Sequence, residues 1–128
     1  QKVCLRFKID AYIFLSCRLM RKYEDSYRHK GPRKKLIDLL KEKGISDERV
    51  LEAMMNIPRH YFLDTALQEI AYEDRAFPIA EGQTISQPYT VAYQTQLLQI
   101  KQYDKILEIG TGSVYQASAL AEIGGQQL

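Results

Sequence analysis

The residues best suited to chemistry lie in two short motifs, and the first is GQTISQP at residues 82–88. It carries the hydroxyls of Thr84 and Ser86 and the carboxamides of Gln83 and Gln87 just ahead of a predicted helix. In an extended chain Thr84 and Ser86 point to the same side, and a helix N-terminus attracts anions through its unpaired N–H groups and its dipole. The motif therefore predicts an anion site, although helix capping by Ser86 alone explains it equally well.

The second motif, KILEIGTGS at residues 105–113, predicts an apolar strand from Lys105 to Ile109 that runs into a glycine turn. Glycine at positions 110 and 112 lets the backbone approach a ligand closely. Glu108, just before the turn, can attract a cationic group of an adenosyl-amino-acid cofactor. Together the two motifs indicate a carboxylate held beside an adenosyl cofactor.

Two other nucleotide-binding patterns fit this turn poorly. A dinucleotide fingerprint has a third glycine where this chain has Tyr115, so a dehydrogenase is disfavoured. No Gly-Lys-Ser or Gly-Lys-Thr follows the turn, which excludes a P-loop.

Composition sets wide bounds on the class of protein. The 128 residues are 45% hydrophobic and 27% charged, which is typical of one globular domain. A formal net charge of +2 gives no reason to expect nucleic-acid binding. Cys4 and Cys17 match no metal-ligand or redox spacing, so we expect no metal site, no disulfide framework and a cytoplasmic location.

The N-terminal region divides from the rest at Met20. Its apolar stretch AYIFLSC, residues 11–17, is too short to cross a membrane, and Asp10 at its edge disfavours a secretory signal. We expect residues 1–19 to be an extension outside the fold. Residues 20–100 form a predicted helical region with the substrate loop, and residues 101–128 the first, incomplete strand-turn-helix of a cofactor-binding domain.

Apolar spacing predicts the helices of the middle region. One runs from Arg33 with a stripe of leucine and isoleucine to a left-handed cap at Gly44, and a second opens at Ser46 and ends at Pro58. A third begins with Pro88 at its first position and continues to about Ile100. The predicted buried residues of these helices are Leu36, Ile37, Leu39, Leu40, Val50, Leu51, Met54, Met55, Val91, Ala92, Thr95, Leu97 and Leu98.

The segment between the second and third helices has no clear period. His60 lacks a partner at catalytic spacing, so we interpret it as a structural hydrogen-bonding residue. Asp74 can form a local charge pair with Arg75, and we assign it no chemistry.

Four stretches resemble the protein-L-isoaspartate O-methyltransferases: ISDERVLEAMMNIPRHYFL, AYEDRAFPI, GQTISQPYTVA and KILEIGTGSVYQASALA. The resemblance covers about residues 23–123, and GQTISQP is its most specific part. It implies an α/β, Rossmann-like S-adenosylmethionine methyltransferase fold, truncated here, preceded by a helical subdomain.

The resemblance also implies an activity. Such enzymes transfer the methyl group of S-adenosylmethionine to the α-carboxyl of L-isoaspartyl and D-aspartyl residues in damaged proteins, with no metal. It implies that Ser86 is catalytic, that Thr84, Ile85, Ser86 and Gln87 bind the substrate, and that Glu108, Gly110, Thr111 and Gly112 bind the cofactor. The implied partners are isoaspartyl peptides and proteins, without nucleic acid or membrane, and the full-length protein would be a monomer.

One departure from the family pattern affects the glycine turn. The family's EIGTGSGYQA has a glycine where this chain has Val114, and we expect a β-branched residue there to crowd the cofactor or to forbid a positive φ. The alternatives are a truncated, inactive fragment that acts at most as a cofactor- or partner-binding module, a noncatalytic helical module, and a general adenine-nucleotide binder.

Overall fold

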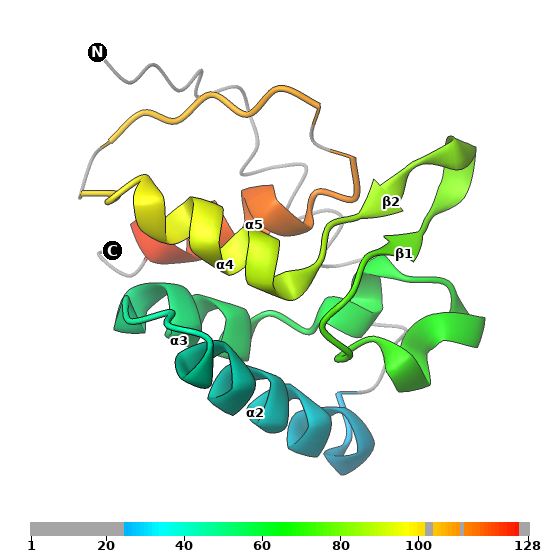
Figure 1. The fold of residues 1–128 in the computed structure, drawn as a ribbon. Coiled ribbons are helices and arrows are strands. Elements are labelled where there is room, and N and C mark those ends of the chain that lie inside the picture. Colours follow the sequence, from blue (N-terminus) through cyan, green and yellow to red (C-terminus); the bar gives the residue numbers. More distant parts are fainter. Residues whose placement is uncertain (1–24, 102–103, 111, 126–128) are drawn as a thin grey trace.

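The computed structural model describes residues 25–101, 104–110 and 112–125, and four helices dominate them (Figure 1). These are α2 (Tyr27–Glu42), α3 (Glu48–Asn56), α4 (Pro88–Leu97) and α5 (Tyr115–Gly125). Three short 3-10 helices, Arg59–Phe62, Thr65–Ile70 and Ala80–Gly82, lie between α3 and α4. No helix within these ranges is both long and apolar enough to cross a bilayer. The expected extension at residues 1–19 lies outside the described residues.

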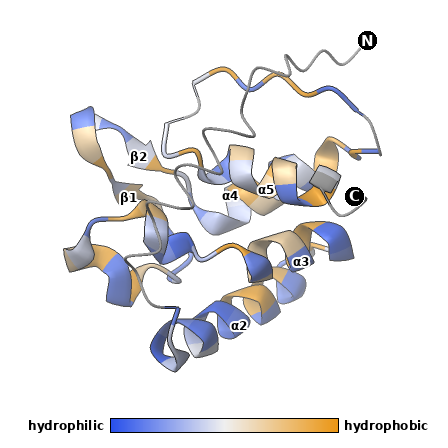
Figure 2. Ribbon diagram, turned by 180° about the vertical axis from the view of Figure 1, so that it is seen from behind, coloured by the Kyte–Doolittle hydropathy of each residue, from blue (hydrophilic) through white to orange (hydrophobic). Residues whose placement is uncertain are grey.

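Helix α3 is the centre of the packing, because α2, α4 and α5 all contact it. Its strong apolar face buries Val50, Leu51, Ala53 and Met54. Figure 2 shows hydrophilic residues on the outward side of α2 and hydrophobic residues where the helices meet. The described buried apolar residues form one continuous core that includes members of all four helices.

The predicted helices are confirmed, with shifted boundaries. Helix α2 begins at Tyr27, five residues before Pro32, although Pro32 has no N–H to donate within the helix. Gly44 has φ +98°, which confirms the left-handed cap. Helix α3 is capped by Asp47, whose carboxylate accepts the Arg49 N–H, and not by Ser46, since the anionic oxygen suits the positive end of the helix dipole better.

The prediction of the helical core was accurate except at two leucines. Met55 and Leu98 are partly buried, and the other predicted core positions, apart from Leu39 and Leu97, are buried. Leu39 is 36% exposed and Leu97 is 61% exposed. Leucine on a protein surface is common, so spacing alone could not separate these two from the core.

A small antiparallel hairpin carries the first motif. Strand β1 (Phe77–Pro78) pairs with β2 (Thr84–Ile85), with Phe77 opposite Ile85 and Pro78 opposite Thr84. Phe77 and Ile85 point into the core, so the neighbouring residues Thr84 and Ser86 are exposed. The sequence predicted an extended turn here but not its pairing partner.

The predicted strand Lys105–Ile109 is absent: residues 104–110 are irregular, on the side of the molecule opposite α2 (Figure 1). Leu107 is 53% exposed and Ile109 is 88% exposed. A buried strand needs neighbours that satisfy its N–H and C=O groups, and the only sheet in the described residues is the β1–β2 pair. The segment is largely apolar, as the sequence analysis noted, but no other described segment pairs with it to form a sheet.

Val114 adopts a left-handed backbone conformation, with φ +65°. The expectation that a β-branched residue forbids a positive φ there was therefore wrong. The turn still imposes a positive φ, because Gly110 at +75° and Gly112 at +50° share it and Tyr115 is anchored in the core. Strain is the consequence, since β-branched residues are rare in this region.

We expect Val114→Gly to raise the free energy of unfolding by about 1 kcal/mol, because the relieved strain exceeds the entropy that glycine adds to the unfolded chain. Val114 is 39% exposed, so little apolar burial is lost. Urea unfolding measures the change. Ala121→Gly at an exposed position of α5 is the control and should lower stability by about 1 kcal/mol. An equal loss of stability in both variants would show that Val114 is not strained.

Candidate active site

The hairpin presents its polar residues on the exposed face around the fully buried Ile85. Thr84 and Ser86 are exposed on either side of it, as the extended pattern predicted. Ile85 itself is 0% exposed, so only its backbone can contact a substrate. The side chain of Gln87 is occupied within the protein, where Nε2 donates to the Asp74 carbonyl at 3.1 Å.

The N-terminus of α4 already holds an anion, and that anion is Asp74. The Tyr89 N–H donates to Asp74 Oδ1 at 2.8 Å, and Pro88 has no N–H. Lys43 Nζ lies 2.6 Å from the other carboxylate oxygen, and only 5% of the Asp74 side chain is exposed. Arg75 pairs instead with Glu73, so the predicted Asp74–Arg75 pair was wrong. Asp74 caps the helix, so capping by Ser86 is not needed to explain the motif.

The glycine turn lies directly against the hairpin, although nearly thirty residues of chain separate them. A Cβ built on Gly112 would meet Gln83 Oε1 at 3.6 Å and the Thr84 carbonyl oxygen at 3.9 Å. The two motifs that sequence analysis singled out therefore form one surface. Thr111 lies outside the described residues.

Glu108 is half-buried just before this turn. Burial raises the pKa of its carboxyl group, and its Oε2 atom is enclosed without a hydrogen-bond donor among the described residues. A buried carboxylate oxygen without a donor is unfavourable unless a donor or cation reaches it. Glu108, Gly110 and Gly112 thus combine a carboxylate oxygen that no described donor reaches with glycine backbone that carries no side chain.

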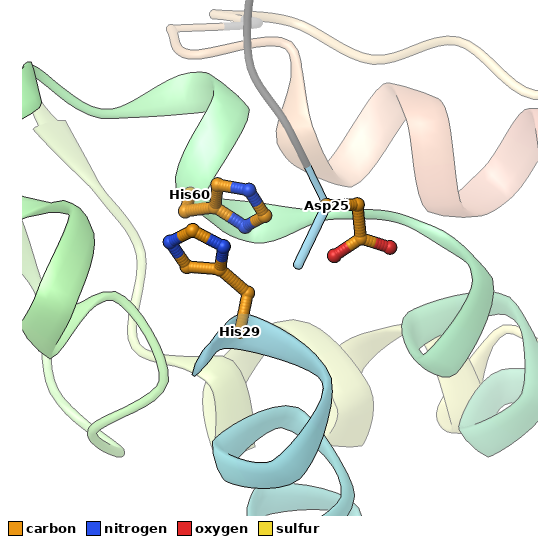
Figure 3. Close-up of side chains that lie close together, drawn as sticks. All are labelled: Asp25, His29 and His60. Carbon is orange, nitrogen blue, oxygen red and sulfur yellow. The ribbon is translucent and has the colours of Figure 1, made fainter. Parts of the chain in front are cut away.

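A second polar cluster joins Asp25, His29 and His60, whose potential ligand atoms lie within 4.8 Å of one another. The two imidazole rings are stacked (Figure 3). Their centroids lie 3.7 Å apart, and their planes are 8° from parallel. A metal ion bonds in the plane of an imidazole, so two parallel stacked rings cannot both ligate it. Both oxygens of Asp25 accept hydrogen bonds from Arg33. This geometry favours a structural network and does not fit a metal centre.

The interpretation of His60 as a structural residue is confirmed. It is fully buried, and its Nδ1 lies 2.7 Å from the hydroxyl of Tyr72. Arg33 donates to the same hydroxyl at 3.1 Å, and burial raises the pKa of Tyr72 to about 12. The network fixes the start of α2 against the segment that leads to the hairpin. Sequence spacing gave no signal for it, because its members come from three separate segments.

The fold and the paired motifs define a class of protein, and comparison with known proteins agrees. A solved structure of a protein-L-isoaspartate O-methyltransferase matches 74% of this chain and 31% of its own, with TM-score 0.64 and 31% sequence identity. The predicted class, a Rossmann-like S-adenosylmethionine methyltransferase fold, is thereby confirmed. The described residues contain mainly its helical part.

The particular family follows from sequence. The profile of the family "Protein-L-isoaspartate(D-aspartate) O-methyltransferase (PCMT)" matches residues 31–128, and this chain belongs to that family. The protein-L-isoaspartate O-methyltransferase of Cytophaga hutchinsonii is 63% identical over 101 residues, which are 79% of this chain and 46% of the relative. That of Christiangramia forsetii is 55% identical over 103 residues, 80% and 48% respectively. The chain spans about half the length of these relatives.

The Asp25–Arg33 pair makes stability depend on pH. Burial alone would raise the pKa of Asp25, but the hydrogen bond and charge of Arg33 outweigh it and hold the pKa below 3.8. A lowered pKa stabilises the fold above the unfolded-state value, and this contribution is lost as pH falls through the folded-state value. We expect Asp25→Asn to lower the free energy of unfolding by about 1–2 kcal/mol at neutral pH.

The difference between Asp25→Asn and the parent should shrink as pH is lowered below 3.8 and through the lowered folded-state pKa of Asp25, because the parent then becomes protonated at this carboxyl group. Urea unfolding across this range measures it. Asp38→Asn, at an exposed position of α2, is the control and should stay within about 0.5 kcal/mol of the parent. A loss of stability in Asp25→Asn that does not depend on pH would show that the charge of Asp25 does not stabilise the fold.

Proposed function

We propose that this chain carries the substrate hairpin and the first cofactor loop of a protein repair methyltransferase. The reaction would transfer a methyl group from S-adenosylmethionine to the α-carboxyl of L-isoaspartyl or D-aspartyl residues in damaged proteins. The closeness of Gly112 to Gln83 and Thr84 carries the proposal, because it brings the carboxylate motif beside the cofactor motif. Family membership and the names of the relatives favour this over a binding-only module.

In this proposal each loop has a distinct task. Ser86 and Thr84 would donate hydroxyl hydrogen bonds to the substrate carboxylate, and the Ile85 backbone would align the peptide. Glu108, Gly110 and Gly112 would hold the cofactor, with Thr111 assigned by resemblance. The cofactor would supply an electrophilic sulfonium methyl group. The carboxylate is already anionic and nucleophilic, so alignment and exclusion of water contribute more than a general base, and no metal ion is required.

The proposal extends to partners and location. Isoaspartyl-containing peptides and proteins would be the substrates, since the exposed hairpin can be reached by an extended peptide. We propose that the full-length protein is a cytoplasmic monomer that binds neither nucleic acid nor membranes. The small net charge agrees with this choice of partners.

We expect the 128-residue chain to bind S-adenosylhomocysteine in calorimetric titration and to methylate an isoaspartyl peptide. Ser86→Ala should lower methyl transfer by about 10-fold or more, because one donor to the reacting carboxylate is lost, and should leave the affinity for S-adenosylhomocysteine within about twofold. Ser46→Ala, an exposed serine outside both loops, is the matched control and should change neither quantity.

Three outcomes separate the alternatives. Cofactor binding without methyl transfer would favour a binding module. Binding of neither cofactor nor isoaspartyl peptide by the folded chain would refute the proposal for this chain. A Ser86→Ala variant as active as the Ser46→Ala control would remove Ser86 from the site.

A further inference from the structure

Arg59 is the most enclosed charged residue in the described part of the chain. It opens the 3-10 helix Arg59–Phe62 and is 0% exposed. None of the described ion pairs includes it, and burial lowers the pKa of its guanidinium. A buried cation is unfavourable unless hydrogen bonds compensate for the lost water, so its contacts must account for its position.

Those contacts join the two ends of the β1–β2 hairpin. Arg59 Nε donates to the Ala71 carbonyl at 3.0 Å, and Nη2 donates to the Ser86 carbonyl at 2.9 Å and to the Arg75 carbonyl at 3.3 Å. Ala71 and Arg75 precede β1, and Ser86 follows β2. The planar guanidinium presents several donors in a fixed arrangement, so one side chain holds both ends of the hairpin.

The same guanidinium also contacts the segment that follows the glycine turn. Its Cζ lies 4.9 Å from the ring centroid of Tyr115, the first residue of α5. Tyr115 is buried, and Phe62, in the same 3-10 helix as Arg59, packs edge-on against it at 5.4 Å between centroids. A cation over an aromatic face is attracted to it, more strongly when both are desolvated. Arg59 therefore contacts both the Ser86 backbone in the first motif and the first helical residue after the glycine turn.

We infer that Arg59 is a positioning residue: through the Ser86 carbonyl and the Tyr115 ring it fixes the hairpin against the glycine turn. Any effect of Arg59 on substrate binding rests on the function proposed above. The guanidinium acts on the backbone behind Ser86 and is enclosed in the core, so it is not assigned a contact with substrate. Its effect is on the spacing between the two loops.

Arg33 supplies a matched control, because it is a second buried arginine with a different task. Its guanidinium hydrogen bonds to Asp25 and Tyr72, and none of its described contacts reaches the hairpin or the glycine turn. Arg59→Lys and Arg33→Lys make the same chemical change: each keeps the charge and loses the multiple-donor geometry. Arg59→Gln is a second variant that also removes the charge.

Hydrogen–deuterium exchange of the 128-residue chain tests the inference without relying on activity. We expect Arg59→Lys and Arg59→Gln to speed exchange in peptides covering residues 83–89 and 112–118 by about 10-fold, as loss of a hydrogen bond from a charged donor predicts. Arg33→Lys should change the same peptides by less than about twofold and act mainly on α2. Affinities for S-adenosylhomocysteine and an isoaspartyl peptide should fall in the Arg59 variants only.

Each result decides the question. Equal exchange in the Arg59 and Arg33 variants, or unchanged protection of the two loops, would overturn the inference. Loss of the fold in both Arg59 variants, with Arg33→Lys still folded, would also overturn it, because Arg59 would then support the whole core. If the parent binds neither ligand, the proposed function fails for this chain, and the exchange result still decides the role of Arg59.

Discussion

The burial of one short helix is the constraint on which the rest of this structure depends. Helix α3 has only nine residues, too few to be stable alone in water, and it buries Val50, Leu51, Ala53 and Met54. Burying a side chain such as valine, leucine or methionine contributes about 1.5–3 kcal/mol. That gain is available only when α2, α4 and α5 surround α3, so α4 and α5, which are far from α3 in sequence, join α2 and α3 in one core.

Two buried arginines connect this core to its polar surroundings in different ways. Arg33 meets a carboxylate and a tyrosine hydroxyl at the start of α2, whereas Arg59 meets backbone carbonyls and an aromatic ring beneath the hairpin. The first arrangement neutralises a charge, and the second distributes it over dipoles. This difference explains why burial lowers the pKa of Arg59, whereas Asp25 and Tyr72 raise that of Arg33 despite its burial.

The candidate site combines a well-supported hairpin with a strained turn. The hairpin is fixed by Phe77 and Ile85 in the core, and Asp74 supplies the helix cap that its polar residues would otherwise have to provide. The turn carries Val114 at a positive φ and follows an irregular segment with exposed Leu107 and Ile109. In a Rossmann-like fold such a segment lies within a parallel sheet, which explains its apolar sequence.

The sequence by itself determined the helices, the left-handed cap at Gly44, the start of α4 at Pro88 and the two motifs, because these depend on side-chain spacing and on the backbone preferences of single residues. It could not determine that Asp74 caps α4, that Arg59 reaches Ser86, or that Gly112 touches the hairpin. Those contacts join residues 15 to 29 positions apart, and only packing around α3 decides which of them meet. The predicted strand Lys105–Ile109 failed for the same reason: a strand exists only where neighbouring backbone satisfies its hydrogen bonds.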